Sequence, residues 1–163
     1  YHHIRQEFYK DLLNICDEIN FENKKIEKKF KEKMDSWKSE MMRLYVKNPV
    51  KYPKKVKNSI EHHINSLSTI HDESVSNIDN RFPHITFQTL ASKDVQNTVN
   101  EYFGLLKAYD KDYFENMLRK QNIGHPPTSE LKDALNKLYI ITQKKYDEMI
   151  EQIKSEMKHF NNN

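Results

Sequence analysis

The chain has 163 residues, of which 36% are apolar, 31% are charged and only two are glycine. This length allows one domain with its own core, and the few glycines and prolines argue against an all-β fold. One cysteine excludes an intramolecular disulfide and a zinc site built on paired cysteines, and the net charge of +3 favours no partner class by itself.

The longest regular pattern covers residues 4–45. Its apolar side chains recur in steps of four and seven, an eleven-residue period close to that of an undistorted α-helix. No proline occurs before Pro49, so the pattern predicts a helix over residues 3–47, about 65 Å long at 1.5 Å per residue. The stripe consists of Ile4, Phe8, Ile15, Ile19, Ile26, Phe30, Trp37 and Met41, flanked by Leu12, Asn23, Met34 and Tyr45.

Three further helices are predicted. The second covers residues 53–81 with Pro53 in its first turn, and the third covers residues 92–122 with Ser92 as its N-cap. The fourth covers residues 128–160. Residues 84–91 fit either an irregular loop or an early turn of the third helix. Short connections make neighbouring helices antiparallel, so we predict a single-domain, up-down-up-down four-helix bundle with an unusually long first helix.

The extra length of the first helix leaves three arrangements open. Its first two turns project and expose Ile4 and Phe8, or it bends near Asn20–Asn23, or residues 84–91 cover it. Gly104 lies inside the third predicted helix, where a close approach of two helices would explain a glycine.

Positive charge is concentrated in residues 24–58, which hold thirteen Lys or Arg against four Asp or Glu, about +9. The remainder holds fourteen against twenty, about −6. Such a segment can meet anionic lipid or phosphate, or it can be a solvated face paired with acidic neighbours. The predicted membrane or partner surface consists of Ile4, Phe8, Lys24, Lys25, Lys28, Lys29, Lys31 and Lys33.

Four polar residues fall on or beside the apolar stripes: Asn23, His63, Ser74 and Thr142. Buried polar groups weaken a core, so we expect a bundle that can open and offer its apolar faces to a membrane or a partner.

No pattern indicates catalysis. The sequence lacks a glycine-rich phosphate loop and a nucleophile triad, and no apolar run is long enough to cross a membrane. The best metal candidate joins residues 61–63 to His71 and Asp72, but His63 and His71 lie about 12 Å apart along one helix. We therefore predict no enzyme activity, no metal, no cofactor and no small-molecule substrate.

Residue usage points to an AT-rich genome such as that of a malaria parasite, because Lys outnumbers Arg 23 to 4. With the stretches LLNICDEINFENKKIEKKF and DSWKSEMMRLYV, the chain resembles the family of the Plasmodium sporozoite protein essential for cell traversal. That resemblance implies a small secreted four-helix bundle of the micronemes, released through an N-terminal signal upstream of Tyr1. It also implies a non-enzymatic role in host-cell traversal, with a host-cell membrane or an unidentified protein as partner.

Other interpretations remain open. The first is a helical protein-interaction scaffold or surface ligand, either exported or on the merozoite or sporozoite. Exported helical modules of the parasite usually carry several tryptophans, whereas Trp37 stands alone here. The second is an RNA-binding bundle, which is disfavoured because the aromatic residues 102–114 have the helical spacing of a core rather than of a base-stacking surface.

Overall fold

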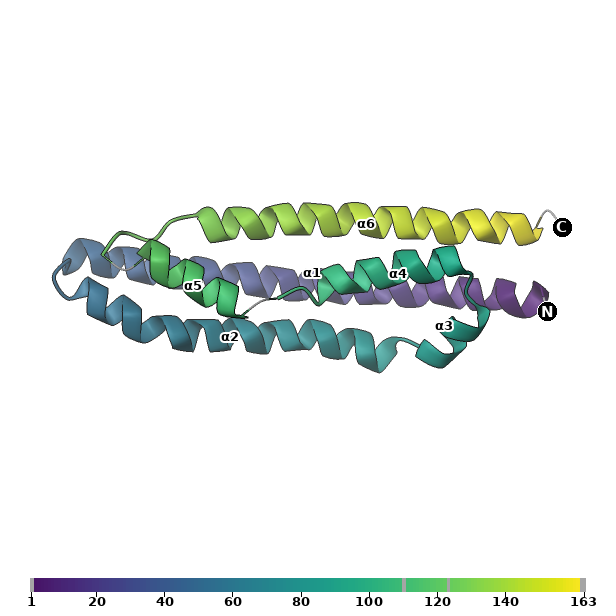
Figure 1. The fold of residues 1–163 in the computed structure, drawn as a ribbon, viewed down its shortest axis with the longest axis horizontal. Coiled ribbons are helices and arrows are strands. Elements are labelled where there is room, and N and C mark those ends of the chain that lie inside the picture. Colours follow the sequence, from purple (N-terminus) through teal and green to yellow (C-terminus); the bar gives the residue numbers. More distant parts are fainter. Residues whose placement is uncertain (1, 110, 123, 162–163) are drawn as a thin grey trace. The chain divides into compact units, whose positions relative to one another are not determined.

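The computed structural model describes residues 2–109, 111–122 and 124–161, and these are helical and without strands (Figure 1). The predicted all-α class and the long first helix are confirmed. The helices are α1 (His2–Lys47), α2 (Tyr52–Arg81), α3 (His84–Leu90), α4 (Lys93–Leu106), α5 (Lys111–Asn122) and α6 (Glu130–Asn161).

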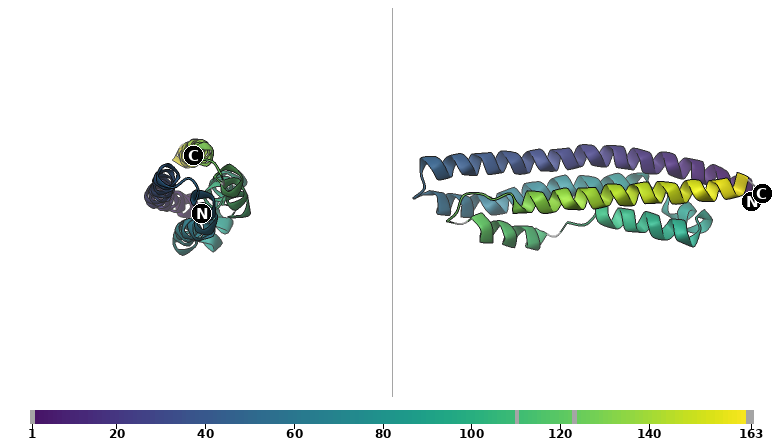
Figure 2. Two further views of the ribbon diagram at one scale, coloured as in Figure 1. Left: turned by 90° about the vertical axis from the view of Figure 1, so that its left-hand side faces the viewer. Right: turned by 90° about the horizontal axis from the view of Figure 1, so that it is seen from above.

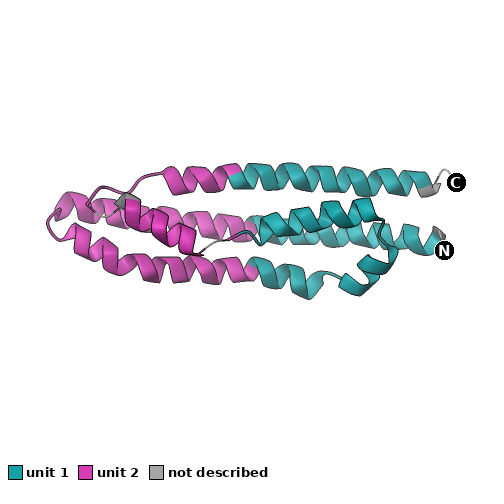
Figure 3. Ribbon diagram, viewed as in Figure 1, with its two compact units in different colours: residues 1–24, 74–108, 138–163 teal, residues 25–73, 109–137 magenta. Residues whose placement is uncertain are grey.

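The chain divides into two compact units (Figure 3). Unit 1 contains residues 1–24, 74–108 and 138–163, and unit 2 contains residues 25–73 and 109–137. Helices α1, α2 and α6 each contribute to both units. The single domain that we expected from the sequence stays a prediction.

Unit 1 has a core drawn from α1, α2, α3, α4 and α6. The start of α1 and the end of α6 lie at the same end of this unit (Figure 2), so the two helices are antiparallel there. The buried core consists of Phe8, Tyr9, Leu12, Cys16, Ile19, Ile78, Phe82, Phe87, Ala91, Val95, Val99, Tyr102, Phe103, Leu106, Met149 and Ile153.

A polar cluster joins three helices of unit 1. The Tyr9 hydroxyl donates to Glu156 Oε2 at 2.7 Å and accepts the Ser92 backbone N–H at 3.0 Å. The Ser92 hydroxyl donates to the other Glu156 oxygen and accepts the Val95 N–H at 3.2 Å. The predicted N-cap at Ser92 is therefore confirmed, and the cap also ties α4 to α1 and α6.

Unit 2 is built from α1, α2, α5 and α6. Trp37 of α1 donates its indole N–H to the Ser59 hydroxyl of α2 at 3.3 Å, and Lys132 of α6 pairs with Asp35 of α1 at 2.8 Å. Its buried apolar side chains include Phe30, Met34, Met41, Tyr52, Val56, Ile60, Ile64, Leu67, Phe114, Leu118, Leu131 and Leu135.

The third predicted helix, residues 92–122, is wrong as one continuous element. The structure has α4 and α5 instead, with the break after Leu106. Tyr109 explains the break, because its ring stacks on His71 at 5.0 Å and its hydroxyl donates to the Ile64 carbonyl at 3.4 Å, both on α2. The segment at the break contains no proline or glycine that would end a helix. The contacts of Tyr109 therefore outweigh the helix propensity of this segment.

The break also changes which face of the helix is buried. A continuous helix would bury Tyr113, but the structure leaves Tyr113 exposed and buries Phe114 and Leu118. Phe114 is eight residues after Leu106, which in an unbroken helix would place it about 80° away from the stripe.

Three smaller expectations are also settled. Helix α1 is continuous through Asn20–Asn23, and residues 84–90 form a short helix of their own. The expectation of a close helix approach at Gly104 is wrong, since a Cβ built there meets nothing within 4 Å. Gly124 has a φ of +78°, a left-handed conformation that glycine adopts readily.

We predict that two chemically identical substitutions have different effects on stability. Tyr9→Phe removes two hydrogen bonds at a buried site and should lower the free energy of unfolding by about 1–3 kcal/mol. Tyr52→Phe should leave it unchanged or raise it, because the buried Tyr52 hydroxyl has no hydrogen-bond partner in the described chain. Denaturant unfolding followed by circular dichroism measures both, and equal losses would contradict this account.

Candidate functional site: the tip of the α1–α2 hairpin

The connection between α1 and α2, with the helical turns on either side, carries an unbalanced positive charge. We call residues 43–57 the tip. It contains six cations and no acid, and the acid-free stretch extends from residue 41 to residue 60. All six cations are exposed: Arg43, Lys47, Lys51, Lys54, Lys55 and Lys57.

Local chemistry holds the tip in this conformation. Pro49 disfavours helix at Asn48, so α1 ends at Lys47. The Asn48 side chain then accepts the Lys51 backbone N–H at 3.2 Å, and the Asn48 carbonyl accepts the Tyr52 N–H at 3.1 Å. The turn is thus hydrogen-bonded at both ends, and α2 starts within one turn.

The tip has a buried inner side and a positive, partly apolar outer surface. Tyr52 and Val56 are fully buried, and the Tyr52 ring meets the Tyr45 ring edge-on with centroids 5.2 Å apart. Burial raises the pKa of Tyr52 to about 12, so its phenol stays neutral at physiological pH. Val46 and Val50 are instead 71% and 88% exposed, which places two aliphatic side chains among the six cations.

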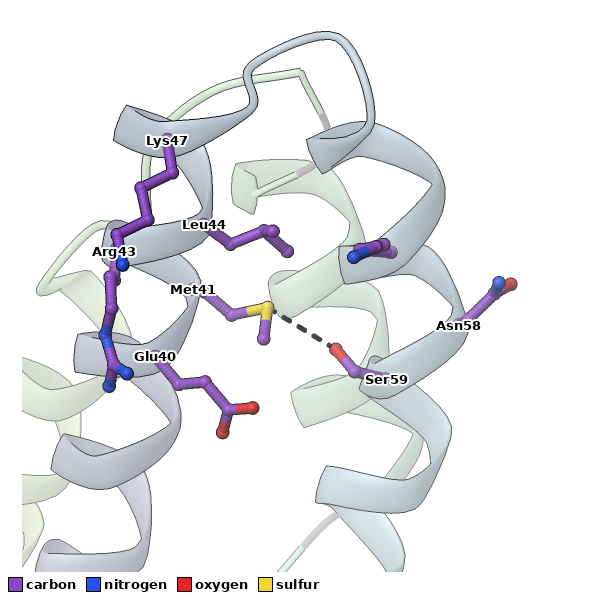
Figure 4. Close-up of a pocket in the computed structure, with 8 residues that line it drawn as sticks. Glu40, Met41, Arg43, Leu44, Lys47, Asn58 and Ser59 are labelled. Carbon is purple, nitrogen blue, oxygen red and sulfur yellow. Dashed lines mark hydrogen bonds between the residues drawn. The ribbon is translucent and has the colours of Figure 1, made fainter.

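A groove of about 530 Å³ lies beside the tip, between α1 and α2 (Figure 4). Met41, Leu44 and Glu40 extend from α1 toward α2, and the Ser59 hydroxyl meets the Met41 sulfur at 3.6 Å. The remaining lining residues are Arg43, Lys47, Lys55 and Asn58. The groove thus combines an apolar floor with three cations and one carboxylate.

The surface predicted from the sequence is only partly exposed. Ile4 is 57% exposed, but the prediction for Phe8 is wrong, because this side chain is 7% exposed and belongs to the core of unit 1. Helix α1 does not present the two residues together: Phe8 lies one turn further on, where it packs into the core with its neighbour Tyr9.

The predicted lysine run is exposed but partly neutralised. Lys24, Lys25, Lys28, Lys29 and Lys33 are exposed, and Lys31 is half-buried. The Lys29 ammonium lies 2.9 Å from Glu73, and that of Lys28 lies 4.0 Å from Glu32. The run therefore mixes with acidic side chains in a way that the tip does not, which makes the tip the stronger candidate for contact with an anionic surface.

The polar residues predicted for the interior, Asn23, His63, Ser74 and Thr142, are all buried. Asn23, Ser74 and Thr142 belong to unit 1, where the Thr142 hydroxyl donates to the Leu138 carbonyl at 2.8 Å. His63 belongs to unit 2 and stacks on Trp37 with ring centroids 4.6 Å apart and planes 7° from parallel.

His63 is held neutral by its surroundings. Burial, together with the electrostatic effects of Lys33 and His62, lowers its pKa from 6.5 to about 4. A cavity of about 20 Å³ beside it is lined by Asp35, Lys38 and Lys132, among others. Protonating this ring places a charge in a site that stabilises only the neutral form.

The described residues show no group of three or more His, Cys, Asp or Glu that could hold a metal ion. In the metal candidate considered from the sequence, His63 stacks on Trp37 and His71 stacks on Tyr109, so the two rings have separate aromatic partners. Within the described ranges, no helix combines the length and the hydropathy that crossing a bilayer requires.

Comparison with known proteins adds no relative. No protein-family model, no curated protein and no solved structure matches this chain.

Sequence reasoning overlooked the tip, although part of its signal was visible. The absence of acid from residue 41 to residue 60 is visible in the sequence, but the four acids of residues 24–40 mask it when residues 24–58 are taken together. The exposure of Val46 and Val50 could not be read, because Val56 has the same residue type and is fully buried.

We predict that His63 makes stability depend on pH. The unfolded chain binds a proton on His63 near pH 6.5 and the folded chain only near pH 4, so stability is lost as the pH falls through this window. The loss is on the order of 3 kcal/mol. His63→Phe keeps a stacking ring and should flatten the pH dependence of stability. His62→Phe, at the exposed neighbouring position, should leave that dependence largely unchanged. Thermal unfolding at a series of pH values measures all three proteins, and parallel curves would contradict the assignment.

Proposed function

We propose that this protein is a non-enzymatic, secreted helical protein of a malaria parasite that acts at host-cell membranes during traversal or invasion. In this proposal it leaves the micronemes and docks on anionic lipid through the tip. The observation that supports docking is the composition of the tip, where six exposed cations and two exposed valines are accompanied by no acid.

The magnitudes fit a reversible contact. Each Lys or Arg near an anionic leaflet contributes about 1 kcal/mol, an effect that fades within a Debye length of about 8 Å. Burying Val46 and Val50 adds about 1.5 kcal/mol each. The six cations are distributed around two helices and cannot all reach the membrane surface at once. The total binding free energy is therefore on the order of several kcal/mol. A single lipid anchor has a similar scale and also binds reversibly.

We further propose that the chain forms a four-helix bundle in which α4 and α5 share the third position. In support, the core of unit 1 uses α1, α2, α4 and α6 together with the short α3, and the core of unit 2 uses α1, α2, α5 and α6. The buried polar residues lower the cost of separating helices. Opening of the interior after docking would then bring apolar helix faces to the membrane.

A helical protein-interaction scaffold or surface ligand is the second candidate. Ile140 and Ile141 favour it, because these adjacent residues of α6 are both exposed and give unit 1 an apolar spot away from the core. A small apolar contact of this kind suits a protein partner better than a charged lipid surface.

We predict salt-sensitive binding to anionic vesicles. In flotation with vesicles containing phosphatidylserine, the protein should bind, and it should stay unbound with phosphatidylcholine alone. Lys51→Glu/Lys54→Glu should weaken binding by roughly 100-fold or more, because two attractive charges become repulsive.

The matched control is Lys24→Glu/Lys28→Glu, which changes the net charge equally on the predicted lysine run. It should weaken binding much less than the tip variant. Equal losses would move the contact to the lysine run, and no binding to anionic vesicles would refute docking. Binding to single-stranded RNA with a steep salt dependence, in the absence of vesicle binding, would favour the nucleic-acid alternative.

A further inference from the structure

We propose that the groove beside the tip binds the phosphorylated polyol headgroup of a membrane lipid, as found in a phosphoinositide. This inference rests on the proposed docking and names the lipid chemistry that the docking site recognises. Its evidence is the lining of the groove rather than the total charge of the tip.

The three cations of the groove lack partners that would neutralise them. The described chain contains no ion pair for Arg43, Lys47 or Lys55, although ion pairs occur elsewhere along α1. Arg43 and Lys47 are four residues apart on one helix, a spacing at which like charges repel. Figure 4 shows the two side chains along the same flank of α1. An anion between them would remove this repulsion.

A phosphate suits these cations better than a carboxylate does. The Arg43 guanidinium offers a planar fork of N–H donors for two oxygens, and the two lysines supply point charges. A phosphate monoester presents up to two charges and three oxygens to the same cations, whereas the serine headgroup carries a net charge of only −1 at neutral pH.

The remaining polar residues favour a polyol. Glu40 lines the groove and would repel a bare phosphate, but its carboxylate accepts hydrogen bonds from hydroxyl groups. Asn58 on the opposite side supplies both donors and an acceptor. The volume of about 530 Å³ exceeds what a phosphate alone needs and lies in the range of small-molecule sites.

The position of the groove along α1 matches the headgroup layer. If Val46 and Val50 enter the acyl boundary, Arg43 lies about 4.5 Å and Glu40 about 9 Å further along α1 from Val46. The headgroup region of one leaflet is about 5–8 Å thick. Arg43 would therefore stand at the level of the lipid phosphates.

The test compares two sets of vesicles matched for total surface charge, one with phosphatidylinositol 4-phosphate and one with phosphatidylserine. The wild-type protein should bind the phosphoinositide vesicles about tenfold more tightly. Arg43→Gln/Lys55→Gln should remove this preference. Lys51→Gln/Lys54→Gln removes the same charge from outside the groove lining, so it should weaken binding to both vesicles and keep the preference.

The outcomes separate this inference from the proposed function. Equal affinity of the wild-type protein for both vesicles overturns the headgroup site and leaves anionic docking intact. Loss of the preference in both variants also overturns it, because the effect then follows charge alone. Binding to phosphoinositide vesicles only would support the groove and refute general docking on anionic lipid. Soluble inositol 1,4-bisphosphate should bind more weakly than the lipid; equal affinity overturns the assignment to a lipid.

Discussion

The structure depends on one constraint, the apolar stripe of α1, which a single helix cannot bury. In unit 1, Leu12 and Ile19 of the stripe are fully buried, together with the neighbouring Cys16, within a core completed by α2, α3, α4 and α6. In unit 2, Phe30, Met34 and Met41 are buried among α2, α5 and α6. Each such side chain contributes about 1.5–3 kcal/mol when it leaves water. The other helices are placed where they cover this stripe, so its phase decides which of their faces turn inward.

The same constraint explains why the tip is exposed. The apolar stripe ends near Tyr45, and Pro49 then ends the helical path. Among the residues that follow, Tyr52 and Val56 are buried in the core, and every cation of the tip is exposed. The stretch from residue 41 to residue 60 contains no acid. A positive, partly apolar surface is therefore the direct consequence of ending a buried stripe in an acid-free segment.

The interior has a second consequence, a sensitivity to acid. His63 occupies a stripe position of α2, and its stacking on Trp37 supplies packing without supplying a counter-charge. The ring therefore behaves as an apolar side chain at neutral pH and as a buried charge at low pH. The cluster of Tyr9, Ser92 and Glu156 shows the opposite design, because there each polar group is satisfied by a hydrogen bond to another helix.

Periodicity and capping chemistry predicted α1, α2, the N-cap at Ser92 and most of α6, because those features are local in sequence. They could not predict the break between α4 and α5, since the contacts of Tyr109 with α2 that cause it are tertiary. Phe8 and Ile4 lie on the same stripe, and only the packing around Tyr9 shows that one is buried and the other exposed. Identifying the tip required both the sequence, which shows its charge, and the structure, which shows that its valines are exposed.

We propose that the tip, and not the start of α1, meets the membrane. Val50→Cys and Ile4→Cys each introduce one reactive thiol, because Cys16 is fully buried and burial raises its pKa to about 12. Each variant would carry a polarity-sensitive fluorophore and be mixed with anionic vesicles that contain a lipid-bound quencher. This account predicts a blue shift and quenching for the label at residue 50 and neither for the label at residue 4. A signal at residue 4 alone, or at neither position, would contradict it.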